Sequence, residues 1–124
     1  MAMSQLKTFI IMLLLITHTG AAPAKDDEER IAFNNHCRMC HSIRPNDNRL
    51  GPTMHGIFGA EAGQVKGFNG YSGSLNGLVW DEVTLNRFIA DPASVSSNTN
   101  MIFPPVQDAE ERKKIISFLK SLAK

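Results

Sequence analysis

The chain has 124 residues and carries 13 Lys and Arg against 12 Asp and Glu, so its formal net charge is +1. This near-neutral balance argues against nucleic acid as a partner, because phosphate binding needs a clustered excess of Lys and Arg. The length limits the chain to one domain once a leader is removed.

Residues 1–24 have the pattern of a secretory signal peptide. Lys7 gives a positive start, residues 9–16 form an uncharged apolar run, and small residues follow up to Ala24. The run is too short to cross a bilayer, and charge follows it in place of a stop-transfer pattern. We expect cleavage after Ala24, with cleavage after Ala21 and an uncleaved anchor as alternatives. The mature domain, residues 25–124, is then formally neutral with 12 basic and 12 acidic residues, and has no stable membrane insertion.

A helix is predicted from Asp26 to about Arg38, with Asp26 and Asp27 as its caps. Its end runs into residues 37–41, Cys-Arg-Met-Cys-His. This C-x-x-C-H spacing is the one that attaches a c-type haem. Cys37 and Cys40 can each form a thioether with one vinyl group of the porphyrin, and His41 then lies where its imidazole can bind the iron.

Three other interpretations of the cysteine pair remain open at this point. A thioredoxin-like dithiol needs a βαβ context and no histidine. A zinc site usually takes a second Cys or His pair at ligand spacing, which the remaining histidines do not form. A structural disulfide is the third. We favour haem, and the rest of the chain strengthens this interpretation.

Eight of the nine glycines lie between Gly51 and Gly77, a density that predicts irregular backbone. Asp81 then marks the start of a second helix, which Asp91 and Pro92 end. Residues 108–111, Asp-Ala-Glu-Glu, resemble a capping box before a last helix with apolar residues at helical spacing.

The predicted fold is therefore all-α, with three to five short helices and long glycine-rich loops. Helices this short, with a loop of nearly thirty residues, bury too little apolar surface to be stable alone. Long ordered loops usually wrap a ligand. One covalently held haem would supply the missing core, so composition and motif agree.

The sixth ligand of the iron is sought in residues 98–103, between the second and last helices. A thioether favours Fe(II), so Met101 opposite His41 would suit an electron carrier. Core packing is the commoner fate of a methionine. Met39 and Met54 are competing candidates.

The mature chain resembles the class I c-type cytochromes, the family of mitochondrial cytochrome c and its soluble bacterial relatives. The likeness covers nearly all of residues 26–124. It rests on Phe33 four residues before Cys37, the loop of residues 51–59, Gly67-Phe68 with Tyr71-Ser72, Trp80, Thr99, Met101-Ile102-Phe103, and Phe118.

The resemblance implies a small cytochrome c fold with one covalent haem c. It implies that Met101 is the axial ligand, that Tyr71, Trp80 and Thr99 contact haem propionates, and that Phe103 lies beside the haem. The Pro52 carbonyl is the expected acceptor for the Nδ1–H of His41, although Pro52 is otherwise a simple turn residue. Tyr71 and Trp80 have ordinary buried aromatics as the alternative. His55 is expected to be a loop residue, and His36 to lie at the exposed haem-side surface.

Several positions depart from the family pattern. Glu29 stands where members often have a glycine, which predicts a looser crossing of the first and last helices unless the register differs. Phe88 stands where the family has a tyrosine, and Ala60 where mitochondrial members have an arginine near a propionate. Pro104-Pro105 takes the place of a turn of small residues. Ala93, Ser94 and Asn100 occupy positions where mitochondrial members carry lysine.

We interpret the chain as a periplasmic, monomeric, monohaem electron carrier rather than an enzyme. An iron bound by both His41 and Met101 has no open site. Its partners would be redox proteins: a donor dehydrogenase or cytochrome complex, and an acceptor oxidase or other reductase. The alternatives are a haem subunit of a periplasmic oxidoreductase, and a haem-based peroxidase or sensor if Met101 is not a stable ligand.

Overall fold

The computed structural model describes residues 20–123, which contain four helices. They are α1 (Lys25–His36), α2 (Glu82–Ala90), α3 (Pro92–Val95) and α4 (Ala109–Ser121). The all-α prediction is confirmed for this part of the chain. Most of the predicted signal peptide, residues 1–19, lies outside the described residues. None of the described helices has the length and apolar character that a bilayer crossing requires.

Helix α1 begins and ends slightly earlier than its sequence pattern indicated. Its N-cap is Ala24, without a side-chain cap bond, so the predicted capping by Asp26 and Asp27 was wrong. Both carboxylates lie in the first turn, where the helix dipole favours negative charge. The helix stops at His36 rather than Arg38, because the chain leaves it in a turn that begins the cysteine motif.

The predicted caps of α2 and α4 are confirmed. The carboxylate of Asp81 accepts a hydrogen bond from the backbone N–H of Thr84 at 2.7 Å. Asp108 accepts from the backbone N–H groups of the second and third residues of α4, at 2.8 and 3.3 Å. Helix α3 was not predicted. Asp91 and Pro92 do end α2, but the same two residues are also the N-cap and first residue of α3.

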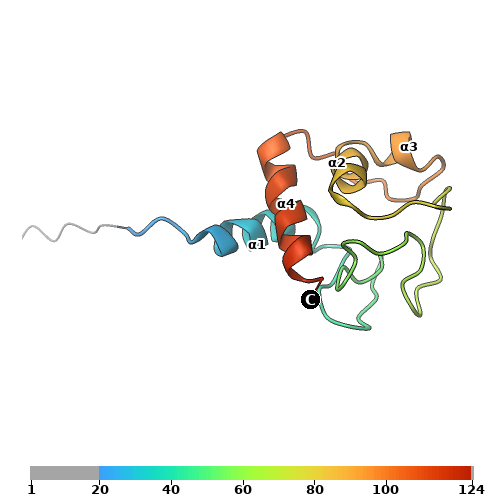
Figure 1. Cartoon of the computed structure of the whole chain (residues 1–124), viewed down its shortest axis with the longest axis horizontal. Coiled ribbons are helices and arrows are strands. Elements are labelled where there is room, and N and C mark those ends of the chain that lie inside the picture. Colours follow the sequence, from blue (N-terminus) through green and yellow to red (C-terminus); the bar gives the residue numbers. More distant parts are fainter. Residues whose placement is uncertain (1–19, 124) are drawn as a thin grey trace, which may run out of the picture.

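Helices α1 and α4 cross and pack directly against each other (Figure 1). The rings of Phe33 and Phe118 lie 5.3 Å apart between them. Glu29 is also in this crossing, only 7% exposed, and its carboxylate accepts a hydrogen bond from the Ser117 hydroxyl at 2.8 Å. Where the resemblance predicts a glycine, the chain thus has a buried carboxylate with a specific partner on the other helix.

Between α1 and α2 the backbone forms turns and one isolated bridge, between Glu61 and Val79. Two hydrogen bonds of 2.9 Å, from Gly59 N–H to the Trp80 carbonyl and from Trp80 N–H to the Ala60 carbonyl, fix the tryptophan against this loop. The buried core draws on these loops as well as the helices. It comprises Ala32, Phe33, Ile57, Ala62, Trp80, Leu85, Val106, Ile115, Ile116, Phe118 and Leu119.

Arg112 connects three parts of the chain. From α4 its guanidinium donates to the Asn86 side chain on α2 at 2.8 Å. It also donates to the carbonyls of Val106 and Gln107, at 2.8 and 2.9 Å, in the segment that leads into α4. The backbone N–H of Val106 bonds in turn to the carbonyl of Ile89 at 3.1 Å. This segment is therefore fixed to both helices.

Candidate functional site

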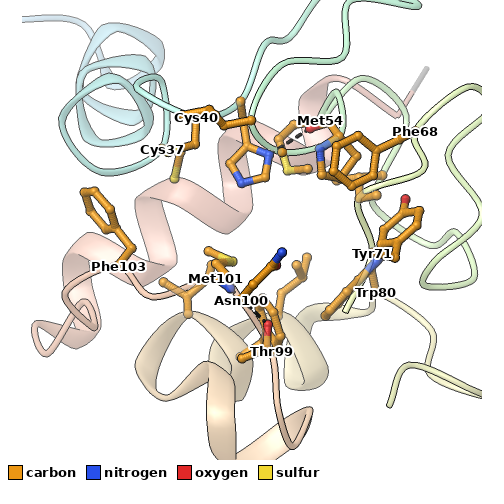
Figure 2. Close-up of a pocket in the computed structure, with 18 of the residues that line it drawn as sticks. Cys37, Cys40, Met54, Phe68, Tyr71, Trp80, Thr99, Asn100, Met101 and Phe103 are labelled. Carbon is orange, nitrogen blue, oxygen red and sulfur yellow. Dashed lines mark hydrogen bonds between the residues drawn. The ribbon is translucent and has the colours of Figure 1, made fainter. Parts of the chain in front are cut away.

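A cavity of about 440 Å³ lies between the helices and the glycine-rich loops, and its lining is mainly apolar. Figure 2 shows Cys37 and Cys40 on one side of this open space and Met101 on the opposite side. All nine site residues expected from the sequence line the cavity: Cys37, Cys40, His41, Pro52, Tyr71, Trp80, Thr99, Met101 and Phe103. The fold thus collects them from five separate stretches of chain.

The cysteine motif forms a tight turn directly after α1. The backbone N–H groups of Cys40 and His41 both bond to the carbonyl of Cys37, at 3.1 and 3.0 Å. Burial, and then the neighbouring Cys40, raises the pKa of the Cys37 thiol to about 12. A redox dithiol needs a lowered thiol pKa. The environment of Cys37 therefore does not favour the thioredoxin-like interpretation.

His41 is buried, and a hydrogen bond to a backbone carbonyl fixes the orientation of its ring. Its Nδ1 lies 2.7 Å from the carbonyl oxygen of Pro52, so Nδ1–H donates and Nε2 is left as the free ligand atom. Burial lowers the pKa of His41, and the bond to Pro52 opposes that shift. The neutral imidazole that results is the form that binds metals.

The residue before Pro52 makes room for this ring. A Cβ at Gly51 would lie 2.2 Å from Cε1 of His41 and 2.6 Å from Nδ1, far inside contact distance. The imidazole therefore occupies the space that a side chain at position 51 would need. Gly51 belongs to the loop motif of residues 51–59, but its contact with His41 could not be predicted from the sequence.

Met101 approaches from the other wall, in the segment between α3 and α4. Its backbone N–H bonds to the Thr99 hydroxyl at 3.2 Å. Figure 2 shows Thr99, Asn100 and Met101 together on this wall, with Phe103 to one side. Met54 also lines the cavity, whereas Met39 does not and is 78% exposed. Of the two competitors, Met54 is thus the one that the fold brings to the site.

Aromatic side chains close one end of the cavity. The rings of Trp80 and Phe88 meet edge to face at 4.8 Å, as do those of Phe68 and Tyr71. The Tyr71 hydroxyl accepts a hydrogen bond from the backbone N–H of Val65 at 3.1 Å, which leaves its own O–H to donate. Tyr71 and Trp80 therefore retain polar tips near the cavity, as a propionate contact requires.

The two remaining described histidines differ in position. His36 lines the cavity, half-buried, with its Nε2 at 3.5 Å from Glu111 on α4, so it is less exposed than expected. His55 is exposed and lines a separate cavity of about 290 Å³. Leu50 and Ser72 also line the cavity but were not predicted as site residues, because neither belongs to a spacing that predicts a ligand.

The cavity fits a covalently attached haem. Its volume is in the usual range of cofactor pockets, which are mostly apolar with a few placed polar groups. Two thiols and an oriented imidazole lie on one wall, with a thioether on the other. Within residues 20–123, no group of three or more His, Cys, Asp or Glu side chains is arranged to hold a metal ion.

Comparisons with known proteins agree on one family. The chain is 36% identical over 87 residues to cytochrome c2 iso-2 of Magnetospirillum molischianum, covering 69% of this chain and 90% of that one. It is 30% identical over 120 residues to cytochrome c2 of Rhodomicrobium vannielii, covering 94% and 95%. Among solved structures, cytochrome cH from Methylobacterium extorquens superposes with a TM-score of 0.69 at 34% identity, covering 79% of this chain and 99% of the other. No family model matches the chain.

Proposed function

The chain belongs to the class I c-type cytochromes, and from this premise we propose that His41 and Met101 are the two axial ligands of its single haem. The protein binds one haem c covalently and transfers electrons one at a time. The observation that carries the ligand assignment is the cavity with Cys37, Cys40 and His41 on one wall and Met101 on the other.

When bound, the haem supplies an iron that alternates between Fe(II) and Fe(III). The chain's own residues keep the surroundings constant through that change. The Pro52 carbonyl fixes the ring of His41, and the Thr99 hydroxyl holds the backbone of Met101. The apolar lining keeps water away from the site, so little has to reorganise when the charge changes. We propose that Tyr71 and Trp80 contact the propionates, because both line the cavity and have a polar tip.

The protein is a carrier rather than an enzyme on this proposal. If His41 and Met101 both held the iron, no position would remain at which a substrate or gas could bind. The rival functions, a peroxidase and a gas sensor, both require that Met101 leave easily. A haem subunit of a larger oxidoreductase would keep the same ligands but remain bound to its partner.

Redox proteins are the partners of this family, and we propose that they dock by apolar contact at the cavity mouth. Leu50 and Ile102 line the cavity yet are 80% and 92% exposed. Met39, between the two cysteines, is 78% exposed. We further propose that the mature protein, residues 25–124, acts in the periplasm as a monomer. Its donor would be a dehydrogenase or cytochrome complex, and its acceptor an oxidase or other reductase.

The near-infrared absorption of the oxidised protein tests the ligand assignment, because Met–Fe(III) ligation gives a weak band there that open-site haem lacks. We expect this band in the wild type and in Met54→Leu, and its loss in Met101→Leu. Met54→Leu is the matched control, since both methionines line the same cavity. If the band were lost in Met54→Leu and kept in Met101→Leu, the ligand would be Met54 and the assignment of Met101 would be wrong.

A further inference from the structure

We propose that residues 70–73, called here the tyrosine loop, hold residues 96–101, the methionine segment, against the cavity. Ser72 and Gly73 thereby determine how readily Met101 gives up the iron. The inference rests on the proposed ligation by Met101. It assigns a positioning role to two residues far from Met101 in sequence.

Two hydrogen bonds join these segments at the residue just before Met101. The backbone N–H of Asn100 donates to the Ser72 hydroxyl at 2.7 Å, which is short for a bond of this kind. The Asn100 side-chain amide donates to the Gly70 carbonyl at 3.4 Å. Asn100 is thus bound to the tyrosine loop through both its backbone and its side chain.

Close packing joins the two segments a few residues earlier. A Cβ at Gly73 would lie 2.4 Å from the hydroxyl of Ser96, 2.6 Å from the Ser97 carbonyl and 3.1 Å from the Thr99 nitrogen. Ser96 is fully buried. No side chain fits at position 73 unless the methionine segment moves away.

The position of Met101 depends on these contacts because the methionine segment is a tight turn that moves as a unit. The backbone N–H of Thr99 bonds to the Ser96 carbonyl at 3.3 Å, and that of Met101 bonds to the Thr99 hydroxyl at 3.2 Å. Asn98 turns the chain with a positive φ of 60°. Met101 therefore shifts outward only together with residues that the tyrosine loop contacts, so opening of one segment requires release from the other.

Imidazole is a suitable probe, since it binds the iron only after Met101 has left. Its apparent affinity reports the fraction of molecules in which the methionine segment has opened. Loss of one hydrogen bond of ordinary strength should increase that fraction about fivefold. A merely structural role for Ser72 would lower global stability without changing the affinity for imidazole.

The experiment titrates the oxidised haem-loaded protein with imidazole and follows the near-infrared band. Ser72→Ala should bind imidazole about fivefold more tightly than the wild type. Its control is Ser117→Ala, which also removes one serine hydrogen bond but between α1 and α4. Gly73→Ala should bind more than tenfold more tightly. Its control is Gly77→Ala, because the two glycines have matching φ values of 74° and 75° and a Cβ at Gly77 meets nothing within 4 Å.

Tighter imidazole binding in both test variants, with wild-type affinity in both controls, supports the inference. Equal affinities in test and control variants would overturn it and leave the ligand assignment intact. A wild-type protein without the near-infrared band would remove Met101 as ligand and the inference with it. If the Gly73→Ala protein cannot be obtained, the imidazole affinities of Ser72→Ala and Ser117→Ala are compared on their own, and they decide whether the inference holds.

Discussion

The carbonyl oxygen of Pro52 lies 2.7 Å from Nδ1 of His41, and the preceding residue, Gly51, leaves the space in which that imidazole ring lies. One dipeptide therefore both orients the ring and makes room for it. The two effects depend on different atoms, a backbone oxygen and a missing side chain, so they can be separated by mutation.

Gly51→Ala should impair haem binding without altering the cysteines. The added Cβ would meet three atoms of the imidazole at 2.2 to 2.8 Å, so the ring or the loop must move. Overpacking of this kind costs about 1–3 kcal/mol. We expect less haem per polypeptide and a weaker near-infrared band. Gly56→Ala is the control, because its Cβ meets nothing within 4 Å and only the φ of 69° adds backbone strain, and equal haem content in both variants would contradict the prediction.

Without haem the chain should be largely unfolded. Without haem, the mainly apolar lining of the cavity of about 440 Å³ would face water and lose the burial that the porphyrin provides. The whole stability of a small domain is about 5–15 kcal/mol. Circular dichroism of a Cys37→Ala/Cys40→Ala chain made without haem should show little helix. Native-like helix content with a cooperative melt would show that the loops pack by themselves.

The hydrogen bond between Glu29 and Ser117 should contribute measurably to stability. Ser117→Ala leaves a buried carboxylate without its partner on α4, which costs about 1–3 kcal/mol. Glu29→Ala/Ser117→Ala should be less unstable than the two single changes added together, because each single change already removes the bond. Denaturant unfolding of the four haem-loaded proteins measures this coupling. Strict additivity would mean that the hydroxyl and the carboxylate do not interact.

Acid should weaken the start of α2 through Asp81. The hydrogen bond from the Thr84 backbone N–H lowers the pKa of this carboxyl below its ordinary value of 3.8. Its contribution to stability is therefore complete above that value and is lost as the pH falls through the lowered pKa. Asp81→Asn keeps a cap oxygen that does not titrate. The stability advantage of the wild type over this variant, measured by denaturant unfolding, should be constant well above pH 3.8 and should narrow as the pH falls below that value.

A second variant corrects the Asp81 result for the change in net charge. Asp26→Asn removes the same charge from the first turn of α1, where no cap bond is lost. As the pH falls, the difference in free energy of unfolding between the wild type and Asp26→Asn should narrow less than the difference between the wild type and Asp81→Asn. An equal narrowing in both variants would mean that general charge repulsion, rather than the cap, gives the acid dependence.

Electron transfer should depend only weakly on salt. Residues 25–124 carry 12 basic and 12 acidic side chains, and Ala93, Ser94 and Asn100 contribute no charge. Oxidation of the reduced protein by ferricyanide, an anion, and by tris(phenanthroline)cobalt(III), a cation, can be followed by stopped flow. Both rates should change by less than about tenfold from low to high ionic strength, the lower end of steering effects. If one oxidation rate rose and the other fell by more than about tenfold as the ionic strength increased, the protein would have a charged docking face.

Features that depend on neighbours in sequence could be predicted from the sequence. The caps of Asp81 and Asp108 are bonds to residues two or three positions away, and the cysteine motif carries its chemistry within five residues. Helix α3 was missed because four residues show no periodicity, and because Asp91-Pro92 reads equally as an end and as a start.

Contacts between distant residues could not be predicted. Ser72 and Asn100 are 28 positions apart, and Glu29 and Ser117 are 88 apart. Each pair depends on the path that the loops and helices take, which no local spacing encodes. The departure at Glu29 was visible in the sequence, but its partner was not.

The attachment of Arg112 limits how far any movement of Met101 can spread. Four residues separate Met101 from Val106, whose carbonyl and N–H are bound to α4 and α2. Beyond that point the backbone is tied down, so the helices do not follow the loop. If Met101 is the ligand that we propose, its exchange should be a local fluctuation of residues 96–105, with a frequency that does not follow the global unfolding of the protein.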